Sequence, residues 1–382
     1  MTGANLGNND LQPERNREAE FGLDFGFNDQ TSDFSVTYYN KKSSAVILPA
    51  PVNAAANGAS TALLNGATVT NKGWEMQFNA RVYTAKNWDA TIGGNWSRNR
   101  GKVVSLINDI QFIPYNTEGF TGAIGSSTVG FAPGVIRGQD FIRCGLGETA
   151  TLPGVGTMAN VDSACGVGAR KGALFIAGTD NRPVVNPDEQ VLADPNPRWT
   201  GGLTAVIRYK RLQFSTLFDL RRGSQVWDGT LSALDRFGTA EQTTIRSDTA
   251  GIFGKNVLAN QSVAGPGAGQ VAFRTPAQWQ NWYTTTGGSA SAVQSQFVEN
   301  GNFTKWREVS ITYTLDDPWL RQKLGFSQAL IRLGGRNLHT WTPYLGLDPE
   351  TNLGGAEFLT QGIDFFQNPE IRSFTLSITL NR

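Results

Sequence analysis

Few side chains in this sequence are suited to catalysis or metal binding. His339 is the only histidine among 382 residues, so a metal site built on several imidazoles is excluded. Cys144 and Cys165 are the only cysteines. A nucleophilic or redox pair would need a basic group to activate a thiol, and no histidine accompanies them. A disulfide enclosing about twenty residues is the alternative if the segment lies in an oxidising compartment.

Acidic pairs and glycine stretches give no stronger indication of an enzyme. Asp316-Asp317 and Asp348-Pro349-Glu350 both adjoin a proline, and Asp and Pro favour turns. Glycoside hydrolysis would need two carboxylates on opposite sides of the substrate bond, and sequence spacing alone does not show such an arrangement. The glycines at 166–168 and 265–269 lack the strand, spacing and helix of a nucleotide-binding loop. We therefore predict no enzymatic activity, no catalytic residue, no metal and no cofactor.

Aromatic residues in polar, glycine-rich segments are the remaining candidates for ligand contact. Trp227, Trp341 and Tyr344 belong to this group. Such residues could contact a sugar ligand, because the face of an aromatic ring offers an apolar surface on which a sugar ring can pack. Two other roles stay open for each: packing within its own segment, or membership of the aromatic girdle that membrane barrels carry at their interfaces.

The elements that position these residues are predicted by alternation with a period of two, which is typical of strands. Between Trp74 and Tyr83, for example, apolar Trp, Met, Phe, Ala and Val alternate with Glu, Gln, Asn and Arg. Arg81, Arg208 and Asp219 fall on the polar side of their segments and are expected to line a wetted interior. About nine such strands are predicted, beginning near these residues: Glu20, Phe34, Trp74, Trp88, Leu203, Phe214, Val309, Ala329 and Ser373.

The connections between these strands alternate strictly between short and long. Long loops are expected at about 41–70, 99–199, 223–301 and 339–369, so all of them lie at one end of the strands. Outer-membrane barrels have short periplasmic turns and long extracellular loops, whereas a soluble sandwich has no reason to segregate loop lengths. Composition agrees, with 17% charged residues and 33 basic against 32 acidic side chains. That balance excludes a broad nucleic-acid footprint.

The predicted fold is therefore all-β: a partial transmembrane antiparallel β-barrel. The first and last strands run in the same direction, which requires an odd number, whereas single-chain bacterial barrels usually have an even number. An open edge in lipid leaves backbone groups unpaired, so we expect the barrel to be larger than this chain. The alternative is a soluble or surface-exposed β-sandwich that acts as a binding or adhesion module.

Several motifs, in order along the chain, resemble the SusC/RagA branch of TonB-dependent outer-membrane receptors. They comprise Gly7–Glu14 with Glu20–Asp24, Asn71–Glu75, Asn196–Leu203, Arg221–Thr230, Phe303–Val309, Gly335–Leu338, Tyr344–Glu350 and Arg372–Leu376. Each motif alone is weakly specific, but their order and their spread over all 382 residues make the resemblance specific.

The resemblance implies a barrel of about 22 strands closed by an N-terminal plug. It also implies uptake of oligosaccharide or peptide fragments across the outer membrane of a diderm (Gram-negative) bacterium, with a SusD-like lipoprotein as a lid. Energy would come from the TonB-ExbB-ExbD complex through the plug. Residues 1–382 are expected to be the C-terminal barrel part, without the plug and in contact with outer-membrane lipid, and no nucleic-acid partner is expected.

Overall fold

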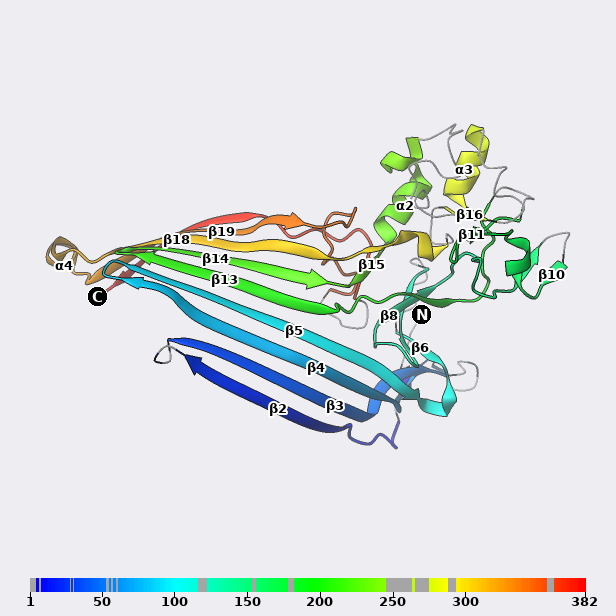
Figure 1. Cartoon of the computed structure of the whole chain (residues 1–382), viewed down its shortest axis with the longest axis horizontal. Helices are drawn as coiled ribbons and strands as arrows, with labels where there is room; N and C mark the ends of the chain where they lie inside the picture. Colours follow the sequence, from blue (N-terminus) through cyan, green and yellow to red (C-terminus); the bar gives the residue numbers. More distant parts are fainter. Residues whose placement is uncertain are drawn as a thin grey trace.

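A single curved antiparallel sheet dominates the computed structural model of this chain (Figure 1). Its strands follow one another in sequence order, as in a meander, and most are 11 residues or longer. The residues that the structure describes are 5–6, 8–27, 29, 31–52, 55, 58–59, 61–115, 122–152, 156–177, 182–244, 263–264, 275–287, 293–355 and 361–382.

Nine strands form the main path of this sheet within the described residues, which confirms the predicted fold class. The short strand β1 (Asn5–Leu6) joins it by parallel pairing with β4. The nine are β2 (Arg15–Phe27), β3 (Ser32–Pro51), β4 (Thr61–Ala85), β5 (Trp88–Leu106), β13 (Trp199–Tyr209), β14 (Leu212–Arg222), β18 (Phe303–Leu315), β19 (Gln328–Trp341) and β21 (Ser373–Asn381).

The two faces of the sheet differ in chemistry, and we call them the apolar face and the polar face. On β2 the apolar face carries Phe21 and Leu23, which are 74% and 62% exposed, while Glu20 and Asp24 point the other way. At the far edge, Phe374 and Leu376 on β21 are each 69% exposed. A water-soluble protein rarely leaves so much contiguous apolar surface uncovered. This surface therefore matches the lipid-facing side of a membrane barrel.

Loop lengths are segregated as the sequence predicts. Figure 1 shows the tight connections and the C-terminus at one end of the strands, which we call the short-turn end, and the large connections at the other, the long-loop end. Between β18 and β19 the turn includes α4 (Pro318–Leu324), which Gly325 ends in the left-handed region at φ 73°. One expectation needs revision: β3 extends to Pro51 and β4 begins at Thr61, so most of the loop expected at 41–70 is a two-stranded ribbon.

The long connections fold into a layer of their own, which we call the loop layer. The first holds β6 (Phe112–Pro114), β7 (Ile124–Thr128), β8 (Val135–Gly138), β9 (Ala150–Leu152), β10 (Gly156–Met158), β11 (Leu174–Phe175) and β12 (Gln190–Ala193). The second holds β15 (Gln225–Asp228), α2 (Gly229–Phe237), β16 (Val263–Ala264), α3 (Pro276–Thr284) and β17 (Val298–Asn300), and the last holds β20 (Ile363–Asp364). Short 3-10 turns lie at Ile107–Asp109, Val161–Ala164, Glu241–Thr244 and Gln294–Phe297. No described helix has the length and apolarity to cross a bilayer.

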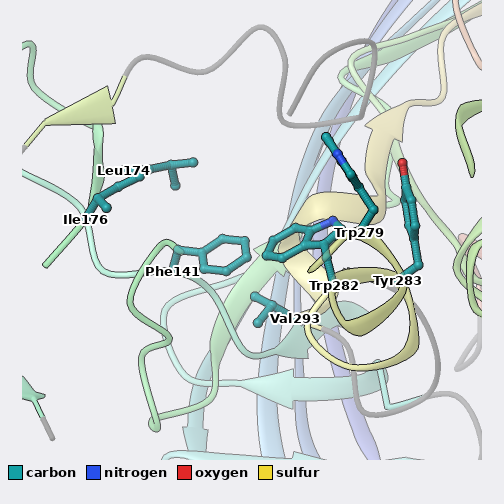
Figure 2. Packing of buried hydrophobic residues seen from close by; sticks show 7 residues of the cluster. All are labelled: Phe141, Leu174, Ile176, Trp279, Trp282, Tyr283 and Val293. Carbon is teal, nitrogen blue, oxygen red and sulfur yellow. The ribbon is translucent and has the colours of Figure 1, made fainter. Parts of the chain in front are cut away.

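Hydrophobic packing holds the loop layer together. Figure 2 shows one cluster, in which Trp279, Trp282 and Tyr283 of α3 meet side chains from the first long connection. Its other members are Phe141, Leu174, Ile176 and Val293. Helix α3 starts with a capping box in which Thr275 and Gln278 satisfy each other's backbone amides. Segments more than a hundred residues apart in sequence thus share one buried core, while the sheet keeps its apolar face outside.

Candidate functional site

A β-bulge on β18 concentrates charge on the polar face near the long-loop end. Trp306 pairs with Phe218 on the apolar face, yet Glu308 pairs with Leu217, so Arg307 is an extra residue in the ladder. A bulge of this kind redirects side chains locally. As a result Lys305 and Arg307 both point to the polar side, beside Asp219 of β14.

These two cations bind the last long connection to the sheet. Lys305 Nζ lies 2.7 Å from Asp348 Oδ1 and is also paired with Glu350, and its side chain is only 3% exposed. Arg307 reaches Asp219 Oδ2 at 2.8 Å and Glu370 Oε2 at 2.7 Å. The acidic pair at 348 and 350, which the sequence suggests is simple turn chemistry, is therefore an ion-pair anchor between loop and wall.

A cavity of about 490 Å³ opens on the polar face beside this network. Its charged lining consists of Asp219, Arg307, Glu308, Arg336 and Glu370, while Gly201 and Gly202 of β13 leave space in the wall. Arg332 is paired with Glu308 from the neighbouring strand. Charges of both signs line this cavity, so it suits a zwitterionic or mixed-charge ligand more than a single ion.

A second cavity, of about 510 Å³, lies at the long-loop end between the polar face and the loop layer. Its floor includes Asn71 of β4 and Asn99 of β5, whose side chains are hydrogen-bonded at 3.2 Å. We call it the mouth cavity. The other described lining residues are Glu14, Ser43, Val46, Leu48, Val69, Ser97, Gly101, Tyr115, Ser127, Ala132, Pro133, Asn196, Pro197, Trp199, Thr200 and Gln361.

The lining of the mouth cavity is mostly uncharged. Glu14 is the one acidic or basic side chain among these described residues, and its carboxylate accepts a hydrogen bond from the amide of Ile47 at 2.7 Å. Asn196 fixes the rim by donating to the carbonyl of Pro133 at 3.0 Å. Burial raises the pKa of the Tyr115 hydroxyl, which stays protonated and pairs with Ser127. Amides, hydroxyls and aromatic rings together suit a neutral ligand rich in hydrogen-bonding groups.

Two of the three aromatic residues singled out in the sequence lie inside the loop layer. Trp227 is 1% exposed and packs in a cluster with Phe297 and Ile363. Tyr344 is 5% exposed and donates its hydroxyl to Asp364 Oδ2 at 2.7 Å. Burial and the neighbouring Asp228 raise the pKa of Tyr344. Both side chains thus pack their own layer, and neither offers a ring face to solvent.

Trp341 lies elsewhere, on the apolar face. It is 50% exposed and its ring is 4.4 Å from that of His339 and 6.5 Å from that of Phe218. Trp306 stacks on Phe218 at 5.9 Å. These rings form a group near the long-loop ends of three strands, the position of an interfacial aromatic girdle.

The remaining predicted residues are also placed by the structure. Cys144 and Cys165 are joined by a disulfide, with Cα atoms 5.9 Å apart, and both are buried in a cluster of the first long connection. Asp316 and Asp317 bind Arg211 at 2.7 Å and 3.0 Å and so link two short turns. The glycines at 265–269 lie outside the described residues.

The three polar-side residues predicted to line the interior are all bound within the wall. Arg81 pairs with Asp89 at 3.0 Å, and Arg208 donates to Gln213 at 3.1 Å. Asp219 belongs to the anchor network described above. Sequence reasoning missed Lys305 and Arg307 as its centre, although both stand within a conspicuous Lys-Trp-Arg-Glu run.

Sequence comparison shows which known proteins this chain is similar to. Residues 1–131 match a family model described as TonB dependent receptor-like, beta-barrel. The chain is 26% identical over 393 aligned residues to TonB-dependent receptor P3 of Formosa agariphila, covering 98% of this chain and 34% of that receptor. It is 20% identical to TonB-dependent receptor SusC of Bacteroides thetaiotaomicron, covering 98% of this chain and 32% of SusC.

Solved structures agree with these sequence matches. A structure of the RagAB peptide importer in its open-open state superposes with a TM-score of 0.65 at 18% identity, covering 99% of this chain and 36% of the matched chain. This chain therefore spans about a third of the length of the relatives it matches. The chain is a partial antiparallel β-barrel, similar in sequence to TonB-dependent receptors such as SusC and in fold to RagAB.

Proposed function

We propose that this chain is part of the wall and mouth of an outer-membrane importer that takes up oligosaccharide or peptide fragments. The observation that carries the proposal is the two-sided sheet: one exposed apolar face along nine strands, and a polar face that holds two cavities beneath a loop layer. Lipid covers the first face, and the second lines an aqueous passage. The long-loop end then faces the cell exterior, and the short-turn end faces the periplasm.

The uncharged mouth cavity supports a glycan or peptide as the substrate class. Its amides and hydroxyls would bind sugar hydroxyls or peptide bonds, and Tyr115 supplies an aromatic ring. RagAB, which shares the fold, is a peptide importer, and this likeness supports a peptide as one of the two candidate substrate classes. The SusD-like lipoprotein lid would dock over the loop layer.

Further strands complete the barrel in this proposal. All 13 residues of β2 are exposed and β21 is exposed over nearly its whole length, so both edges of the described sheet are uncovered. Backbone groups at such edges need partners in lipid. A plug inside the completed barrel would connect it to the TonB-ExbB-ExbD complex, which supplies the energy for import.

Fractionation of the producing cell tests the proposal. An antibody against the first long connection, residues 107–198, should detect the protein in outer membranes, in a band that migrates differently before and after boiling. Detection in the soluble fraction, without any need for detergent, would contradict it. The soluble β-sandwich module would then be the better description, although no second sheet covers the apolar face within the described residues.

A further inference from the structure

The charged residues of strands β2 to β5 are sorted by face. Every acidic side chain of these strands lies on the polar face, as the strand register shows for Glu18, Glu75 and Asp89 among others. Two basic side chains share that face, and both are ion-paired: Lys41 with Glu18 at 4.0 Å and Arg81 with Asp89 at 3.0 Å. The remaining basic residues of these strands lie on the apolar face.

These remaining residues form one group, which we call the basic patch: Arg17, Lys42, Lys72, Arg98, Arg100 and Lys102. Arg15 extends the patch along β2. All seven side chains are exposed, and none is ion-paired with a residue that the structure describes. No acidic residue of β2 to β5 lies on their face.

The register places the basic patch next to the aromatic row of the apolar face. Phe21, Tyr38 and Trp74 stand opposite one another across β2, β3 and β4, and Arg98 continues this row on β5. The rings of Tyr38 and Trp74 are 4.9 Å apart. The other patch residues lie beyond this row, towards the long loops. Aromatic side chains mark the level of the lipid headgroups, so the patch stands at the headgroup level of the outer leaflet.

Like charges face each other directly inside the patch. Arg17 is the cross-strand partner of Lys42, and Lys72 is the partner of Arg100. Such pairs are destabilising because directly opposite side chains are only about 5 Å apart at Cβ. An anion held between the strands would remove the repulsion and would satisfy the donors of several side chains together.

The rest of the sheet provides an internal comparison. At the same level on the apolar face, β13 to β19 carry Trp199, Trp306 and Trp341. The nearby Arg222 is bonded to its own wall, donating to Thr304 Oγ1 at 2.6 Å. The basic patch is therefore a local feature of β2 to β5 and not a general property of the barrel rim.

We propose that the basic patch binds the phosphate groups of an anionic glycolipid in the outer leaflet. The acyl chains of this lipid would cover Phe21, Leu23 and their neighbours, while its phosphates lie between the strands at Lys72 and Arg100. The site rests on the proposed function, since it requires the apolar face to be in the outer membrane. We assign a lipid as its occupant because the basic side chains lie on the same face as an exposed apolar and aromatic surface, directly beyond its aromatic row.

The test compares two double variants of the full-length protein, extracted from outer membranes in a non-ionic detergent. Lys72→Gln with Arg100→Gln removes two charges from the patch, and Lys41→Gln with Lys210→Gln removes two charges elsewhere. Each protein is titrated with a phosphorylated glycolipid, with the same lipid after dephosphorylation, and with inorganic phosphate, while thermal unfolding is followed.

We expect the phosphorylated glycolipid to raise the unfolding temperature of the parent and of the control. The patch variant should bind it roughly 10- to 30-fold more weakly. Equal affinity of the patch variant, or equal binding of the dephosphorylated lipid, would overturn the proposal. So would full protection by inorganic phosphate alone, which would make the patch a site for free anions. If the protein is in outer membranes and yet shows no phosphate preference, only this inference fails, whereas absence from outer membranes defeats the proposed function.

Discussion

Lys305 and Asp348 are 43 residues apart in sequence, and their side chains meet at 2.7 Å in a buried ion pair that joins the barrel wall to the last long connection. Removing one member of such a pair leaves an uncompensated charge, because the surrounding protein excludes the water that would solvate it.

Lys305→Met should therefore release the last connection from the wall. We expect a loss of about 3–5 kcal/mol in the free energy of unfolding, together with faster proteolysis within residues 342–372. Arg332→Gln is the matched control, because Arg332 is half-exposed in its pair with Glu308. It should cost less than about 1 kcal/mol. Equal sensitivity of the two variants would show that the buried network does not anchor the loop.

The disulfide between Cys144 and Cys165 should stabilise the first long connection and leave the barrel unchanged. Replacing both cysteines by serine is expected to cost that segment about 3 kcal/mol in the chain-entropy account. Proteolysis with and without reductant would measure the loss, and heat-modifiable migration would report on the barrel. A change in barrel migration would mean that the two parts do not unfold separately.

Trp227→Ala and Trp341→Ala should separate packing from ligand contact. Trp227 is 1% exposed within a cluster of the loop layer, so its removal should cost about 3–5 kcal/mol. Trp341→Ala should leave the loop layer intact, because its ring lies on the apolar face of the sheet. Thermal unfolding and substrate uptake would be measured for both. Loss of uptake by a stable Trp227→Ala protein would instead support direct contact of that ring with the ligand.

Stability of the loop layer should fall as pH rises from about 4 to 7. Burial raises the pKa of Asp228 and of Asp235 to about 7, far above the ordinary value of 3.8. The folded state therefore binds more protons than the unfolded state in this window. The stabilising contribution of these two carboxyl groups is fully present only below about pH 4 and is lost as pH rises through about 7. Hydrogen exchange in α2 should be better protected at pH 5 than at pH 8, after correction for the intrinsic exchange rate. Asp235→Asn should flatten this dependence, and an unchanged profile would contradict it.

Filling the mouth cavity should reduce uptake without affecting assembly. Ser97 lines this cavity from β5, so Ser97→Trp would occupy space that a ligand needs. Ser97→Ala keeps the volume and serves as the control. Uptake of a labelled oligosaccharide and of a labelled peptide would be compared in cells with equal amounts of the protein in the outer membrane. Unreduced uptake of both substrates by Ser97→Trp would move the binding site elsewhere.

Alternation of side chains predicted the sheet because each strand must satisfy two different surroundings at once. The pattern was sufficient for the strand count, the loop segregation and the fold class. It failed at the ribbon between Lys41 and Asn71, where Ala, Ser, Pro and Val replace the sharp contrast of apolar and charged residues. There both faces meet protein or water, so neither is selected for lipid contact.

The interior of the loop layer could not be predicted in the same way. Trp282 stacks on Phe141 only after two connections of about a hundred and about eighty residues have folded against each other. Short-range sequence patterns do not predict such long-range contacts. The anchor at Lys305 depends on a bulge at Arg307, which shifts the alternation by one residue and is visible in the register of β18 with β14 and with β19.

The loop layer has its own hydrophobic clusters, a disulfide and ion-pair anchors, and in the part of the chain that the structure describes it lies at the long-loop end of the sheet (Figure 1). Its composition can therefore change without disturbing the part that must satisfy a bilayer. Recognition and membrane residence are separable traits in such a molecule. A cell, or a protein engineer, could exchange the connections between the same strands as cassettes and alter the cargo while retaining the wall.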